Sequence, residues 1–105
     1  MNQEELQVAA FEIILNSGNA RATVHEAFSA MREGYYDEAE EKLDLANTEL
    51  VEAHRAQTKL LQDYASGIEM KMEIIMVHAQ DHLMTTMTLR EVALEMLSLY
   101  RKIEQ

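Results

Sequence analysis

Apolar residues recur at helical spacing along this chain and divide it into three long stretches. The first predicted helix covers residues 4–32, and its upstream half is apolar nearly all round, which predicts burial on several sides. Residues 16–19, with the sequence Asn-Ser-Gly-Asn, interrupt this pattern. Because glycine and asparagine resist helix formation, we expect a kink or a short break there. Gly34 then suits a helix C-cap or a turn.

The second predicted helix covers residues 37–62, and a turn at residues 63–67 leads to a third helix over residues 68–104. The face of the second helix opposite its apolar seam is crowded with Asp and Glu, which is usual for a solvated surface. Two hairpin turns joining three helices predict an all-α fold, an antiparallel three-helix bundle, in one domain covering residues 1–105. The apolar residues of the second helix form one seam: Ala39, Leu43, Ala46, Leu50, Ala53 and Leu60.

Composition supports few, long elements and removes several classes of function. The chain has no proline and only three glycines, although turns draw on both residue types. Without cysteine it can form neither disulfides nor thiolate metal sites. Its net charge of −10 disfavours nucleic acid as a partner, and its apolar runs are too short for membrane insertion. The acidic N-terminus lacks the basic region of a secretory signal, so we expect a cytoplasmic protein.

The third predicted helix has two apolar stripes on a wheel of about 100° per residue. One stripe, the intrachain seam, is expected to face the other two helices: Met72, Ile75, Ala79, His82, Thr86, Leu89, Ala93, Met96 and Tyr100. The second, called here the outer stripe, has no partner within a three-helix domain: Met70, Ile74, Val77, Met84 and Thr88. An exposed apolar stripe marks an interface, so we expect an oligomer with the third helix of each copy around a common axis.

Asp81 lies in the middle of the outer stripe. A buried carboxylate is costly unless it is protonated, paired or bound to a metal. Copies of one aspartate that meet at a symmetry axis can share a divalent cation such as Mg²⁺. An ordinary exposed or register-setting polar residue is the alternative interpretation.

His78 lies between the two stripes, at the rim of the cleft expected between two copies. A histidine side chain has a ring nitrogen lone pair that can attack a phosphoryl group, and such transfer needs mainly positioning and charge stabilisation. His82, one turn further on, is placed to donate a hydrogen bond to the phosphoryl oxygens. Gln80 lies on the opposite flank and cannot reach His78 of its own helix, so we expect it to line the cleft of a neighbouring copy.

Two other interpretations remain open from the residues alone. The histidines are passive in a helical adaptor whose outer stripe binds a partner, or His78 and His82 chelate zinc in a small metalloprotein. Ala79 stands where the zinc-protease pattern has glutamate, which counts against hydrolysis. His25 and His54 fall outside any constellation, and we treat them as structural.

Residues 76–85, which contain the run His-Ala-Gln-Asp-His, resemble the phosphorylation-site helix of the lactose/cellobiose-type enzyme IIA family of the bacterial phosphoenolpyruvate-dependent sugar phosphotransferase system. Residues 13–21 resemble the first-helix signature of that family, and residues 39–40, 52–58 and 89–91 fit its pattern as well. The resemblance extends over nearly the whole chain.

The resemblance implies a homotrimer of three-helix bundles with the third helix near the three-fold axis. It implies that His78 receives phosphate from the histidine phosphocarrier protein HPr and passes it to the cysteine of a cognate enzyme IIB. It also implies that Asp81 lies at the axis with Mg²⁺ or a similar divalent cation, shared by three subunits, and that His82 lies near the active site. The family handles lactose, cellobiose and chitobiose-like sugars, and analogy suggests Nε2 as the phosphorylated nitrogen.

Overall fold

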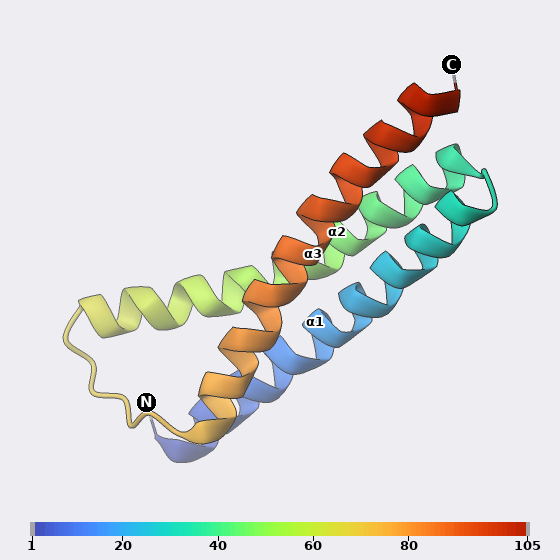
Figure 1. Cartoon of the computed structure of the whole chain (residues 1–105). Helices are drawn as coiled ribbons and strands as arrows, with labels where there is room; N and C mark the ends of the chain where they lie inside the picture. Colours follow the sequence, from blue (N-terminus) through green and yellow to red (C-terminus); the bar gives the residue numbers. More distant parts are fainter. Residues whose placement is uncertain (1, 105) are drawn as a thin grey trace.

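Three long helices form the chain in the computed structural model, which describes residues 2–104. Helix α1 spans Gln3–Arg32, α2 spans Tyr36–Ala65 and α3 spans Ile74–Glu104. Consecutive helices run in opposite directions and form an elongated bundle with extents of 54 × 20 × 18 Å (Figure 1). Within residues 2–104 no helix combines the length and apolarity needed to cross a membrane. The predicted all-α, antiparallel three-helix bundle is confirmed.

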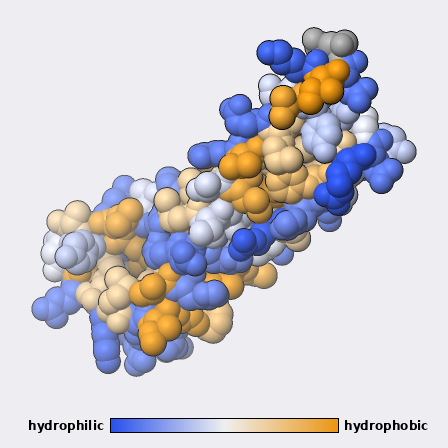
Figure 2. Space-filling model, viewed as in Figure 1, coloured by the Kyte–Doolittle hydropathy of each residue, from blue (hydrophilic) through white to orange (hydrophobic). Residues whose placement is uncertain are grey.

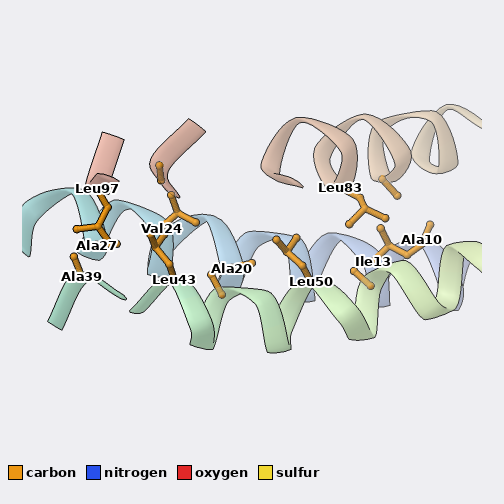
Figure 3. Packing of buried hydrophobic residues seen from close by; sticks show 14 of the residues in the cluster. Ala10, Ile13, Ala20, Val24, Ala27, Ala39, Leu43, Leu50, Leu83 and Leu97 are labelled. Carbon is orange, nitrogen blue, oxygen red and sulfur yellow. The ribbon is translucent and has the colours of Figure 1, made fainter. Parts of the chain in front are cut away.

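The core is a narrow seam in which alanines let the helices approach closely and larger side chains fill the spaces between them. Val24 and Ala27 of α1 lie against Leu43 of α2, and Leu83 and Leu97 enter from α3 (Figure 3). Removing these apolar surfaces from water stabilises the bundle by roughly 25 cal/mol per Å². The seam predicted for α2 is confirmed, because all six of its residues are buried: Ala39, Leu43, Ala46, Leu50, Ala53 and Leu60.

Glycine ends the first two helices by the same mechanism. Gly34 has φ of +83°, and its N–H donates to the carbonyl of Met31 at 3.1 Å while the N–H of Tyr35 donates to the carbonyl of Ala30 at 2.9 Å. This is a Schellman motif, which satisfies carbonyls that a helix end leaves free. Gly67, with φ of +89°, closes α2 through an equivalent pair of bonds. The turn at Gly34 was therefore predicted at the correct place. The second turn was predicted over residues 63–67, but α2 continues to Ala65 and the turn occupies residues 66–67.

Helix α1 differs from its prediction in two respects. It runs without a break through residues 16–19, because Ser17 and Ala20 are buried and packing outweighs the roughly 1 kcal/mol that a mid-helix glycine costs. Its upstream half is also not buried on several sides in this chain. Val8, Phe11 and Leu15 are 61%, 59% and 64% exposed, since α1 contacts its neighbours along only one side there.

Helix α3 begins at Ile74 rather than at residue 68. The last turns of α2 diverge from the other two helices, and the segment between α2 and α3 crosses the resulting gap (Figure 1). An extended segment covers about 3.3 Å per residue against 1.5 Å for a helix, so only an extended one spans this gap with few residues. Met70 and Met72 therefore lie outside α3, and their predicted places on its wheel are wrong.

The buried face of α3 is rotated from the predicted intrachain seam. Ala79, Thr86 and Ala93 are buried as expected, whereas Met96 is exposed. The remaining buried residues of α3 were not in the predicted seam: Met76, Leu83 and Leu97. The rotation arises because α3 packs into the groove between α1 and α2, so its buried side faces both helices.

Candidate functional site

The two histidines of α3 form a stacked pair at the surface. His78 and His82 lie one turn apart, with ring centroids separated by 6.0 Å and ring planes within 4° of parallel. His78 is exposed, while His82 is half-buried. Ala79 and Leu83, each following one histidine, are fully buried and attach this turn of α3 to the core. The pair thus stands on a rigid helix with one imidazole free on the surface.

Helix α1 holds the second imidazole in place. A guanidinium nitrogen of Arg21, Nη1, lies 3.4 Å from Nδ1 of His82. Arginine has no acceptor, so Nδ1 accepts in this contact and the ring proton of a neutral His82 resides on Nε2. A Cβ added to Gly18 would lie 3.7 Å from that Nε2, which places α1 in close contact with the ring.

The surroundings of His82 disfavour the charged form of its ring. Burial lowers the pKa of His82 below its usual value, and the nearby charges of Arg21 and His78 lower it further. The carboxylate of Asp81 opposes this lowering. These surroundings therefore favour the neutral form of the His82 ring.

Asp81 lies on an apolar face of α3 that no other part of residues 2–104 covers. Ile74, Val77 and Met84 of the outer stripe are 88%, 54% and 49% exposed, and Asp81 is itself exposed among them. Apolar patches on the side that carries α3 are visible in Figure 2. Within residues 2–104 no three His, Asp or Glu side chains converge as a metal site would require. A cation site at Asp81 would therefore need ligands from further copies of the chain.

Gln80 lies on the other flank of α3, where it contacts α2. The amide nitrogen of Gln57 donates to the side-chain oxygen of Gln80, whose own nitrogen lies 3.7 Å from the sulfur of Met76. The side chain is half-buried and does not point into bulk solvent. Its role across a subunit boundary remains a prediction.

Three contributors to the site were missed by sequence reasoning: Arg21, Gly18 and Gln57. Each comes from α1 or α2 and touches a predicted residue of α3. Nothing in the spacing along a single helix shows which residues of another helix will face it. Two signals in the sequence concern these residues: segments 13–21 and 52–58 belong to the family resemblance, and Gly18 lies in the expected helix break at residues 16–19.

Comparisons with known proteins agree on one class. A family model described as the lactose/cellobiose-specific IIA subunit of the PTS system matches residues 8–101. The lichenan-specific phosphotransferase enzyme IIA component of Bacillus subtilis (strain 168) is 45% identical over 102 residues, which cover 97% of this chain and 93% of that protein.

Solved structures agree with this result. The crystal structure of PtcA from S. mutans has a TM-score of 0.96 and 77% identity, covering 96% of this chain and 99% of that one. The IIA(Chitobiose) of Escherichia coli, solved in complex with HPr, has a TM-score of 0.82 and 36% identity, covering 95% and 97%. The fold and the matches define a component of a sugar phosphotransferase system. The chain belongs to the lactose/cellobiose-specific IIA family of that system.

Proposed function

We propose that this chain is the phosphoryl carrier of a disaccharide uptake system and that His78 carries the phosphoryl group on Nε2. The observation that carries the proposal is the exposed imidazole of His78, which stacks on the imidazole of His82. Arg21 and Gly18 of α1 lie beside the ring of His82. His82 is half-buried and contacts α1, whereas His78 is open to an approaching protein.

The transfer requires no reactant beyond the two proteins. The lone pair of a ring nitrogen of His78 attacks the phosphorus of phosphohistidine on HPr, and a new N–P bond forms. The N–P bond to HPr breaks, and the departing imidazole keeps its electron pair. In the next step a thiolate of the cognate enzyme IIB attacks the same phosphorus, and His78 leaves as a neutral imidazole. The donor HPr is supported by the E. coli relative, which was solved in complex with HPr.

The proposed working unit is a homotrimer with α3 of each copy near the three-fold axis. The support is the exposed outer stripe, which three copies would bury against one another. In this arrangement Gln80 of one copy lines the cleft that contains His78 of the next, and its amide donates to the phosphoryl group.

Mg²⁺ or a similar divalent cation is proposed at the axis. Asp81 fits such a site only as one of three symmetric copies, because within residues 2–104 of one chain no three His, Asp or Glu side chains converge. Three carboxylates on an axis provide the oxygen donors that Mg²⁺ prefers. The cation would neutralise their mutual repulsion.

Lactose-, cellobiose- or chitobiose-type disaccharides are the proposed cargo, and the phosphoryl relay is proposed to operate in the cytoplasm. The support is the family match and the chitobiose system of the E. coli relative.

Phosphorylation with phosphoenolpyruvate, enzyme I and HPr tests the carrier function. We expect acid-labile, base-stable phosphate on the wild-type chain and none on His78→Ala. His54→Ala is a matched control, because His54 is an exposed histidine on α2, and it should be labelled like the wild type. Full labelling of His78→Ala would refute the proposal. Stoichiometric zinc that is lost with His82→Ala would instead favour the metalloprotein, and an unlabelled wild type would favour the adaptor.

A further inference from the structure

Arg21 differs from the other basic residues in what its side chain contacts. Among residues 2–104 four basic side chains form ion pairs with carboxylates, exemplified by Lys42 with Glu26 at 2.9 Å. Arg21, like Arg32 and Arg90, forms none within that part of the chain. Arg32 donates to the hydroxyl of Ser29 and Arg90 to the carbonyl of Leu43, whereas Arg21 approaches an imidazole. In a chain with a net charge of −10, a guanidinium without a carboxylate partner is available to an anion.

We propose that Arg21 is a phosphoryl-binding residue, which donates to the oxygens of the phosphoryl group on His78. This inference rests on the proposed function, because it names a side chain that binds the phosphoryl group carried on His78. It adds a residue from α1 to a site otherwise formed by α3 and a neighbouring copy.

The geometry brings the guanidinium to the histidine pair. Nη1 of Arg21 is 3.4 Å from His82, and the ring of His82 lies 6.0 Å, centroid to centroid, from that of His78. Arginine has five N–H donors, of which the contact with His82 uses one. The side chain is exposed, so the remaining donors are free to turn toward an added group on His78.

The negative charges near His78 favour a positively charged side chain such as the guanidinium of Arg21. A phosphoryl group brings about −1.5 to −2 charges at pH 7, and Asp81 lies only three residues from His78. The planar guanidinium matches phosphate oxygens with two parallel N–H donors, which a lysine ammonium does not reproduce.

The test compares Arg21→Gln and Arg21→Lys with Arg55→Gln. Arg55 is an exposed arginine on α2 that pairs with Glu52 at 3.2 Å, so its variant makes the same change of charge elsewhere. Each chain is mixed with phosphorylated HPr, and the equilibrium distribution of phosphoryl groups and the initial transfer rate are measured. Loss of a donor from a buried oxyanion site costs 10²–10³-fold, and solvent screening at an exposed site reduces this to about tenfold.

We expect Arg21→Gln to shift the distribution toward HPr by about tenfold, Arg21→Lys to restore part of the shift, and Arg55→Gln to match the wild type. The ³¹P resonance of the phosphohistidine should move in Arg21→Gln. Wild-type values for Arg21→Gln would overturn the inference. The inference would also be overturned if Arg21→Gln and Arg21→Lys lost phosphoryl transfer equally and both had a lowered melting temperature. That result would mean that Arg21 only stabilises the contact between α1 and α3.

These outcomes are separate from those of the proposed function. If Arg21→Gln is labelled on His78 like the wild type, the carrier function stands and only the role of Arg21 fails. If the wild type takes no label, the carrier function itself fails.

Discussion

His78 and His82 have the same side chain and lie on the same helix, yet their surroundings give them different tasks. His82 is turned toward α1, where Arg21 contacts one ring nitrogen and Gly18 lies near the other. His78 has no comparable neighbour in the described residues and stays exposed. A four-residue spacing on one helix predicts that the rings meet, which they do. It does not predict which ring a second helix will hold.

Ser17 provides a prediction at the same scale. Its hydroxyl is fully buried and has no hydrogen-bond partner among residues 2–104. Because an unsatisfied buried polar group costs roughly 1–3 kcal/mol, we expect Ser17→Ala to raise the free energy of unfolding by about 1 kcal/mol. Urea denaturation at a fixed protein concentration measures this change. Ser29→Ala, at an exposed serine of α1, is the control and should change stability by less than about 0.5 kcal/mol. A less stable Ser17→Ala would contradict the prediction.

At the scale of the element, one glycine lowers the stability of a helix and another stabilises the end of a helix. Gly18 lies inside α1 without a positive φ, while Gly67 ends α2 with φ of +89°. Only the second position needs the freedom of glycine.

We therefore expect Gly18→Ala to stabilise the chain by about 0.5–1 kcal/mol and Gly67→Ala to destabilise it by about 1 kcal/mol. The new methyl group at residue 18 would make only ordinary contact with His82, at 3.7 Å. Thermal unfolding followed by circular dichroism at one protein concentration measures both. Destabilisation by Gly18→Ala would show that α1 does need a glycine at that point.

The buried face of α2 could be predicted from the sequence more accurately than the start of α3, and the reason is physical. The seam of α2 was predicted residue by residue, since its apolar residues lie on one face and its charges on the other. The start of α3 was not, because residues 68–73 consist largely of good helix formers. Only the divergence of α2 in three dimensions requires that segment to be extended (Figure 1).

At the scale of the whole molecule, the outer stripe is an apolar surface that stays exposed to solvent in a single chain. The stripe surrounds Asp81, so the proposed trimer would bring three carboxylates together.

We expect Asp81→Leu to give a trimer at least as stable as the wild type, because leucine replaces mutually repelling carboxylates with packed apolar surface. Sedimentation equilibrium over a range of protein concentrations, with and without a chelator, measures the association. Thr88→Leu, which extends the same stripe without removing a charge, is a control for added apolar area. Dissociation of Asp81→Leu into monomers would mean that the cation is essential for assembly.

The sequence by itself determined the helical class, the turn at Gly34, the seam of α2 and the histidine pair, because these depend on periodicity and on residues close together in the chain. It also indicated the uncovered stripe around Asp81. Only the tertiary structure decided the rotation of α3, the continuity of α1 through Gly18, and the contact of Arg21 with His82. Those features arise where separate helices meet, and a pattern within one helix contains no information on which side chains of another will face it.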